Sequence, residues 1–424
     1  MEHFDAAEIL VHLHNRDDPN SPLYSVSLFE DLGLKKELLH GLYLMGFNKP
    51  SKIQERALPL MLRDPPTNLI AQSQSGTGKT GAFVLGMLAR IDFDATDAVG
   101  PQAVCLVNAR ELAVQVHEVM AQMAVHLSAL QSAVVTQGSR APPRTTHAIV
   151  ATPGRLLDLV QRRQVDLGSV KILVLDEADS MVDPTVGQNL AAQAAALRRA
   201  IPETAQCVLF SATFPDRVMR FAENFAPQAN VMRLPLAQVK VDAIMQFALS
   251  VGRGIDAKLD ALGNIYGLVL AGQSLVFVDR RNTAYQIAEY MRSHGFDVGV
   301  LTAADEPAVR DKTMADFRDG NIRVLITTNV LSRGIDISSV GLVINFDLPV
   351  KPGGRGNTPD MEAYLHRIGR TGRFGRAGVA INLIDGPNSE STLEQIRRHY
   401  GMEIHRMTND LDEMERIMHS VQAL

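Results

Sequence analysis

The stretch NLIAQSQSGTGKTGAFVLGMLAR at residues 68–90 decides the fold of this chain. An apolar, strand-like segment leads into a turn of small residues, and an apolar, helix-like segment follows. Glycines in such a turn let backbone N–H groups close around phosphate oxygens, and the helix N-terminus adds partial positive charge. This strand–loop–helix context favours a phosphate-binding loop over a simple glycine-rich turn before a helix.

The predicted loop fits the pattern G-x₄-G-K-[ST] except at its first position, where Ser73 replaces glycine. Lys79 would reach the β- and γ-phosphates of a nucleotide, and Thr80 would ligate Mg²⁺. The residues expected to contact the nucleotide here are Ser73, Gln74, Ser75, Gly76, Thr77, Gly78, Lys79 and Thr80.

Continuous apolar runs recur along the chain and alternate with helix-like segments such as 111–127, 188–200 and 283–294. Uninterrupted apolar strands separated by amphipathic helices are typical of parallel sheets that are covered on both faces. The sequence therefore predicts an α/β fold. The runs that we interpret as buried strands are 103–107, 148–152, 172–175, 207–210, 274–278, 324–327 and 342–346.

The strand-rich pattern occurs twice, over roughly 65–235 and 245–385, and LPLAQVKVD at 234–242 lacks a helical stripe. We therefore expect two tandem domains, each with its own core. The predicted division is a short N-terminal extension at 1–26, a first domain at 27–235, a linker at 236–244 and a second domain at 245–424. Short helices are expected before residue 16 and, after an acidic turn, within 407–424.

Composition excludes several classes of protein. Of the 424 residues, 46% are hydrophobic and 21% are charged, which is typical of a folded globular chain, and no apolar run is long enough to cross a bilayer. The opening residues lack the features of a secretory signal. Cys105 and Cys207 lie in apolar runs, so we expect buried, reduced thiols and an intracellular location. A net charge of −5 argues against coating nucleic acid by charge alone.

An acidic pair follows the strand-like KILVL. Asp176 suits the role of holding the Mg²⁺ shell, and Glu177 suits a carboxylate that orients and activates an attacking water. An exposed acidic turn is the alternative. An acidic pair at a strand end, about a hundred residues after a phosphate-binding loop, rarely arises by accident.

Asp176, Glu177, Ala178 and Asp179 spell the box of the DEAD-box RNA helicases, and the chain resembles this family over about residues 27–385. The resemblance implies two RecA-like domains that bind ATP and Mg²⁺. GFNKPSKIQ resembles the adenine-reading Q motif, in which Phe47 would stack on the base and Gln54 would pair with its edge, with Phe29 as the upstream aromatic residue. Residues 211–213 resemble motif III, whose Ser211 and Thr213, together with Asp179 and His366, would couple hydrolysis to strand separation.

The second half continues this resemblance. SLVFVDRRNTA is similar to motif IV and TTNVLSRGID to motif V, where Gly334 and Asp336 would contact the nucleotide. HRIGRTGR at 366–373 is similar to motif VI, so Arg370 and Arg373 would be arginine fingers on the γ-phosphate. A guanidinium is always charged and forks onto phosphate oxygens, which suits this role.

The family holds single-stranded RNA through phosphates and 2′-hydroxyls, which positions a strand without reading its bases. ARELAVQ at 109–115 is similar to motif Ia, although Asn108 and Ala109 replace its usual proline and threonine, and TPGR at 152–155 is similar to motif Ib. Pro142 and Pro143 make a helix doubtful over 139–148. The resemblance implies that RNA is contacted by Arg110, Thr152, Gly154, Arg155, Arg280 and Thr328.

Several segments resemble the branch of the family that remodels mRNA–protein particles at the cytoplasmic face of the nuclear pore. They include PSKIQERALPLML, Asn329 and the loop KPGGRGNTPD. The branch implies a monomer in cytoplasm and nucleus, enriched at the nuclear envelope, that acts in mRNA export. It also implies nuclear-pore partners and an activator that uses inositol hexakisphosphate. The segment before residue 16 is far shorter than the branch's usual N-terminal extension, so whether it is autoinhibitory stays open.

Three alternatives stay open at this point. An ATP-dependent RNA clamp would use the same motifs, and its steady-state ATP turnover with saturating RNA would distinguish it. A DNA helicase would be distinguished by comparing stimulation by RNA and DNA of one sequence. A P-loop small-molecule kinase predicts one catalytic domain and no HRIGRTGR, and the sequence disfavours it.

Overall fold

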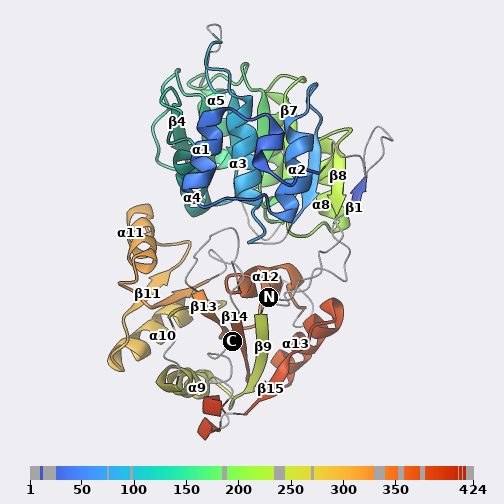
Figure 1. Ribbon diagram of the computed structural model, residues 1–424. Helices are drawn as coiled ribbons and strands as arrows, with labels where there is room; N and C mark the ends of the chain where they lie inside the picture. Colours follow the sequence, from blue (N-terminus) through green and yellow to red (C-terminus); the bar gives the residue numbers. More distant parts are fainter. Residues whose placement is uncertain are drawn as a thin grey trace. The chain divides into compact units, whose positions relative to one another are not determined.

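The computed structural model describes two compact units, Met1–Gln238 and Val239–Leu424 (Figure 1). Each unit is a sheet with helices on both faces, as the sequence predicts. The predicted linker lies almost wholly outside the described residues, which resume at Ile244 in the first strand of the second unit. The described residues are 10–12, 25–73, 76–95, 99–183, 189–233, 244–268, 272–328, 340–351, 358–372, 378–408, 410–412 and 414–416.

The first unit holds an eight-stranded sheet in the order β1-β8-β2-β7-β6-β3-β5-β4. All of its strands run parallel except β1, which pairs antiparallel with β8 at the edge. Parallel neighbours bring the carboxyl ends of their strands to one edge, which positions the site described below. The strands are β1 Leu10–His12, β2 Leu69–Gln72, β3 Ala103–Leu106, β4 Ser132–Val135, β5 Ala148–Ala151, β6 Ile172–Leu175, β7 Gln206–Ser211 and β8 Asn230–Arg233.

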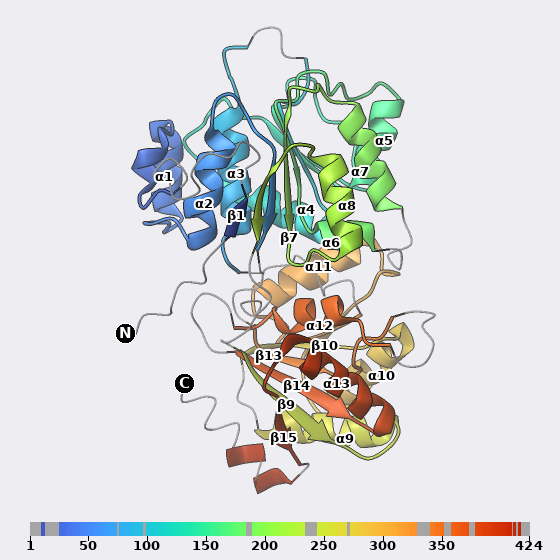
Figure 2. The same ribbon diagram turned by 90° about the vertical axis from the view of Figure 1, so that its right-hand side faces the viewer.

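Two apolar clusters, one on each face of this sheet, form the core of the first unit. Helices α1 to α4 cover one face and α5 to α8 cover the other (Figure 2). The central strands are buried on both faces, which explains their uninterrupted apolar sequence. The helices are η2 Phe29–Leu32 (a 3₁₀ helix), α1 Lys36–Leu44, α2 Lys52–Leu62, α3 Lys79–Arg90, α4 Arg110–Met123, α5 Pro153–Gln161, α6 Ala178–Val182, α7 Leu190–Arg199 and α8 Asp216–Phe225.

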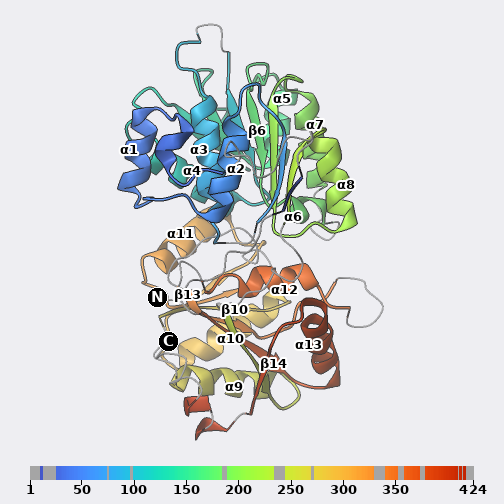
Figure 3. The same cartoon turned by 45° about the vertical axis from the view of Figure 1, so that its right-hand side comes forward.

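The second unit holds a seven-stranded sheet in the order β11-β12-β10-β13-β14-β9-β15, and neighbouring strands in it are parallel. Helices α9 and α10 cover one face, and α11, α12 and α13 cover the other (Figure 3). The elements are β9 Ile244–Ser250, α9 Ile255–Leu268, β10 Gln273–Phe277, α10 Arg281–Ser293, β11 Val298–Leu301, α11 Pro307–Arg318, β12 Val324–Thr327, β13 Val340–Asn345, α12 Met361–Ile368, β14 Gly378–Ile384, α13 Pro387–Tyr400 and β15 His405–Met407.

All seven strands predicted from apolar runs are present, with ends that differ by at most two residues. The helix expected before residue 16 is wrong, because Leu10–His12 forms strand β1. The register pairs Leu10 with Arg233 and His12 with Val231. The edge of β8 that does not pair with β2 has backbone donors and acceptors available for another strand. Residues 10–12 pair with this edge, and the long-range pairing outweighs their weak helical pattern.

Three other predictions are confirmed. Residues 139–147 contain no helix, in keeping with the two prolines in that segment. Cys105 and Cys207 are buried and free. At the C-terminal end, the described positions 411–412 and 414–416 are helical.

Among the described residues, no helix combines the length and the apolar character needed to cross a membrane.

Candidate nucleotide and RNA site

The phosphate-binding loop leaves the carboxyl end of β2 and enters α3 at Lys79. Gly76 and Gly78 have φ angles of +80° and +99°, which glycine adopts without the steric cost of a Cβ atom. The Ser73 hydroxyl is hydrogen-bonded to the Thr77 hydroxyl, and the Ser73 amide donates to the carbonyl of Ser211 on the neighbouring β7. The serine at the first position therefore tethers both ends of the loop. Gln74 and Ser75 lie outside the described residues.

The Q-motif residues lie against this loop. Gln54 accepts a hydrogen bond from the Ser51 amide at 2.9 Å and donates one to the Gly78 carbonyl at 3.1 Å. A Cβ atom on Gly78 would approach the Ser51 hydroxyl to 2.8 Å, and one on Gly81 would lie 3.8 Å from the Phe47 ring. Sequence reasoning missed Ser51, although Ser-x-x-Gln before a helix is the signature of a capping box.

Charged side chains gather where β2 and β6 end. Lys79, Asp176 and Glu177 are each less than 10% exposed, and Lys79 Nζ lies 3.5 Å from Glu177 Oε1. Glu177 precedes α6 with φ at +54°, a left-handed conformation that costs a non-glycine residue energy and is typical of functional sites. The Glu177 amide donates to Asp176 Oδ1 at 2.9 Å.

The acidic box is also joined to motif III. The Asp179 amide donates to the Ser211 hydroxyl at 3.1 Å. Asp179 Oδ2 accepts hydrogen bonds from the Thr213 amide at 3.2 Å and from its hydroxyl at 2.9 Å. Asp179 and Ser211 are fully buried. These contacts connect α6, which carries the acidic box, to the end of β7.

Burial raises the pKa of the Asp176 carboxyl well above its ordinary value. The Lys79 charge opposes this rise, and the neighbouring charge of Glu177 adds to it. Two buried carboxyls facing one ammonium leave an excess of oxygen donors at this position, which is the chemistry that a hard divalent cation satisfies. The oxygen donors of Asp176, after β6, and of Thr80, at the second position of α3, are of the type that Mg²⁺ takes.

The predicted RNA contacts of the first unit lie at the same edge of its sheet. Arg110 begins α4 after β3, and its guanidinium donates to the Thr136 hydroxyl at 2.9 Å. Thr152 caps α5 after β5. Arg155 donates to the Ser139 carbonyl at 2.6 Å. Gly154 packs so closely that an added Cβ would meet Gln193 at 3.1 Å. The predicted nucleotide and coupling residues follow β2, β7 and β6, and the predicted RNA residues follow β3 and β5, so the two sets occupy adjoining halves of one edge.

In the second unit, the predicted RNA residues follow neighbouring strands. Arg280 is exposed and caps α10 after β10, and Thr328 follows β12. His366 lies on α12, and Arg370 lies just beyond its end, where the Arg370 guanidinium donates to the His366 carbonyl at 2.9 Å. Gly334, Asp336 and Arg373 lie outside the described residues.

Arg367 lies within motif VI, and the sequence alone assigned it no role. It is fully buried, and its guanidinium donates to the Asp347 carbonyl at 2.6 Å and to Asp279 Oδ1 at 3.2 Å. Burial lowers its pKa, and the Asp279 charge opposes that shift. Asp279 directly precedes Arg280. The only available sequence signal was an arginine one helical turn before Arg370.

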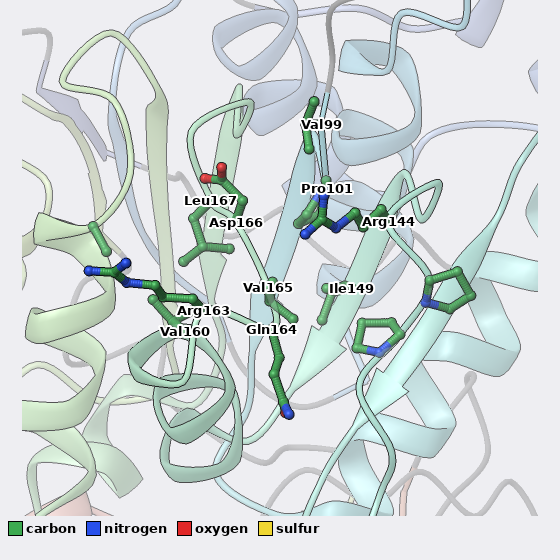
Figure 4. Close-up of a pocket in the computed structure, with 14 residues that line it drawn as sticks. Val99, Pro101, Arg144, Ile149, Val160, Arg163, Gln164, Val165, Asp166 and Leu167 are labelled. Carbon is green, nitrogen blue, oxygen red and sulfur yellow. The ribbon is translucent and has the colours of Figure 1, made fainter.

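A cavity of about 360 Å³ lies elsewhere in the first unit (Figure 4). Its walls come from the segments that precede β3, β5 and β6, including Pro101, Arg144 and Leu167. It therefore opens at the amino ends of these strands. The phosphate-binding loop and the acidic box follow the carboxyl ends, so this cavity is separate from the predicted nucleotide site.

Two family models match the chain. The DEAD/DEAH box helicase model matches residues 51–221, and the model of the helicase conserved C-terminal domain matches residues 257–375. The ATP-dependent RNA helicase DBP5 of Meyerozyma guilliermondii is 47% identical over 407 residues, which cover 95% of this chain and 82% of that protein. The ATP-dependent RNA helicase dbp-5 of Neurospora crassa is 47% identical over 410 residues, covering 96% and 83%.

A solved structure of S. cerevisiae Dbp5 bound to RNA and ADP BeF3 is also similar. Its TM-score is 0.87 at 44% identity, and the match covers 93% of this chain and 100% of that one. The motifs quoted from the sequence, the two RecA-like sheets and these relatives agree. This chain therefore belongs to the DEAD-box family of ATP-dependent RNA helicases, and fungal DBP5 proteins are similar to it over nearly its whole length.

Proposed function

We propose that this helicase uses ATP binding and hydrolysis to grip single-stranded RNA, open short duplexes and displace proteins from mRNA–protein particles. The observation that carries the proposal is a continuous series of contacts at one sheet edge. Lys79 of the phosphate-binding loop contacts Glu177, and Asp179 of the same acidic box is bonded to Ser211 and Thr213. Events at the nucleotide are thereby connected to motif III.

The residues of the first unit have distinct roles in this proposal. Lys79 and the backbone amides of its loop bind the phosphates. Glu177 orients the attacking water and accepts its proton. Thr80 and Asp176 would hold Mg²⁺, which neutralises charge on the phosphate oxygens when it is bound. Phe47 and Gln54 select adenine. Gln54 already contacts Gly78, so base recognition and the shape of the phosphate loop share one side chain.

The second unit completes the proposed reaction. Arg370 and Arg373 would stabilise the transferring phosphoryl group, and Gly334 and Asp336 would contact the nucleotide. RNA would be held by Arg110, Thr152, Gly154 and Arg155 of the first unit and by Arg280 and Thr328 of the second. Because both ligands need residues from both units, hydrolysis requires the units to close, and RNA favours closure.

We further propose that the chain acts in mRNA export, with nuclear-pore proteins and an activator that uses inositol hexakisphosphate as partners. S. cerevisiae Dbp5 variants that resemble this chain have been solved with gle1 and ip6, and with nup159, gle1, ip6 and adp. The proposed location is the cytoplasm and nucleus, with enrichment at the nuclear envelope.

Glu177→Gln tests the mechanism, because the amide keeps the shape of the side chain and loses the base. The variant should bind ATP and RNA but lose RNA-stimulated hydrolysis, whereas Glu203→Gln, a change at an exposed position, should behave as wild type. RNA affinity is measured with a non-hydrolysable ATP analogue, with ADP and without nucleotide. The analogue should tighten RNA binding about 5–150-fold, the usual range of such coupling, and ADP should tighten it much less. Equal RNA affinity in all three states would exclude closure as the mechanism.

A further inference from the structure

Three buried amide side chains lie on one face of the second sheet, under α12 and α13. They are Gln246 on β9, Asn382 on β14 and Asn345 on β13, three adjacent strands, and each is at most 4% exposed. Their apolar neighbours under these helices include Ala248 and Ala380. We call Gln246, Asn382 and Asn345 the amide row. A polar group in such a position is costly unless it is hydrogen-bonded, so its partners reveal what holds it there.

The amide row is joined to Tyr364 of α12. The Tyr364 hydroxyl donates to Gln246 Oε1 at 2.8 Å and accepts from Asn382 Nδ2 at 3.1 Å. Asn382 Nδ2 also donates to the Phe247 carbonyl at 3.0 Å. Tyr364 is completely buried. A residue of α12 is therefore fixed to two strands by directional bonds.

The same row reaches Arg367, one turn further along α12. Asn345 and Asn382 are opposite each other in the β13–β14 register, and Asn345 Nδ2 donates to Asn382 Oδ1 at 2.9 Å. Arg367 Nη1 donates to Asn345 Oδ1 at 3.3 Å. Residues three apart share one face of a helix, so Tyr364 and Arg367 present a polar stripe to the amide row.

Hydrogen bonds can fix the rotation of a helix about its own axis, which apolar packing alone does not fix. Burial of apolar surface is non-directional and depends mainly on the area removed from water, whereas hydrogen bonds weaken steeply as their angles change. A helix on a wholly apolar face could roll about its axis by several degrees at little cost. The bonds of Tyr364 and Arg367 to the amide row oppose that rotation.

We propose that the amide row and Tyr364 are positioning residues for Arg370, and that they set the rotation of α12 at which this arginine can serve hydrolysis. The inference rests on the proposed role of Arg370 as an arginine finger. Arg370 follows Arg367 by three residues, and its amide donates to the Arg367 carbonyl at 3.1 Å, so it moves with the end of α12.

The size of the effect follows from helix geometry. Side chains reach about 5–6 Å from a helix axis, so a rotation of about 10° displaces a terminal group by roughly 1 Å. A displacement of about 1 Å from productive geometry can reduce a rate by up to 100-fold. A partial loss of alignment should therefore lower kcat about tenfold.

The test removes both partners of the hydrogen bond between Tyr364 and Gln246 in one double variant. Tyr364→Phe combined with Gln246→Met deletes the donor and its acceptor while keeping shape, which is close to neutral for stability. The matched control is Tyr266→Phe with Ser274→Ala. It removes another buried tyrosine hydrogen bond of the second unit, 2.6 Å long, between α9 and β10. Both double variants are measured in the full chain for RNA-stimulated kcat, KM for ATP and hydrogen exchange of residues 361–372.

The positioning role predicts that Tyr364→Phe with Gln246→Met lowers kcat about tenfold with little change in KM, and raises exchange of residues 361–372. The control pair should change neither. Equal kcat in the two double variants, or unchanged exchange in α12, would overturn the inference. Arg370→Ala separates this outcome from failure of the proposed function, since full turnover in that variant would remove the finger role whatever the exchange shows.

Discussion

One of the hydrogen bonds between motif III and the acidic box can be removed at a single atom. Thr213→Val deletes the hydroxyl that donates to Asp179 Oδ2 at 2.9 Å. Asp179 is fully buried, so water cannot replace the donor, although the Thr213 and Ser180 amides still bind its carboxylate. Hydrogen bonds to charged groups contribute about 1.5–3 kcal/mol. We expect Thr213→Val to lower the free energy of unfolding of the first unit by about that amount.

The assay must report on the first unit alone, because a chain with two units does not unfold in one two-state transition. The two cysteines provide this probe. Cys105 lies on β3 and Cys207 on β7, both in the first unit, and the chain has no other cysteine. Burial raises the pKa of both thiols, that of Cys207 to about 11. Thiol labelling against urea concentration at neutral pH therefore measures the opening of this unit.

Two variants calibrate the result. Thr213→Ser keeps the hydroxyl and should lie within about 0.5 kcal/mol of wild type. Thr145→Val removes the hydroxyl of an exposed threonine in the same unit and should change the urea midpoint by a similarly small amount. If Thr213→Val and Thr213→Ser have the same midpoint and slope, the buried bond to Asp179 does not hold motif III in place.

Two further predictions concern other parts of the chain. The wild type should have a higher kcat/KM for ATP than for GTP, and equal values for the two nucleotides would refute adenine recognition. Gln54→Leu should weaken the binding of both nucleotides, because Gln54 also contacts Gly78. Hydrogen bonds from Arg397 and Arg398 lower the pKa of Glu394 to about 2, so its stabilising contribution is present above about pH 4.5 and is lost as the pH falls through 2. Thermal unfolding of Glu394→Gln should therefore match wild type at pH 2 and be slightly less stable at pH 7, and an equal difference at both values would contradict this assignment.

The central strands and the phosphate loop were predictable because their local sequence determines their structure. A strand buried on both faces must be apolar throughout, as in Ile172–Leu175, so the run itself identifies the strand. The left-handed backbone of Gly76 and Gly78 requires glycine, so the loop is equally visible in sequence. In both cases the cause lies within a few residues.

Features that depend on distant partners were not predictable in the same way. Leu10–His12 became a strand because β8 has a free edge, which no local pattern shows. The amide row was hidden because Asn345 and Asn382 end or interrupt apolar runs at positions that only the β13–β14 register places opposite each other. The role of Arg367 depends on Asp279, 88 residues away in sequence. Such contacts follow from topology rather than from composition.

The arrangement of the first unit explains why its site contains features that do not favour stability. Glu177 has a left-handed backbone, and Asp176 is buried beside it with a raised pKa. Each of these costs free energy in the protein without ligand. A cation and a nucleotide that bind only the folded protein raise its free energy of unfolding, and this increase grows with their concentration relative to Kd. The acidic box follows β6, and Arg110, a predicted RNA contact, follows the adjacent β3. A change of charge at the predicted nucleotide site would therefore act beside the strand that leads to the predicted RNA contacts.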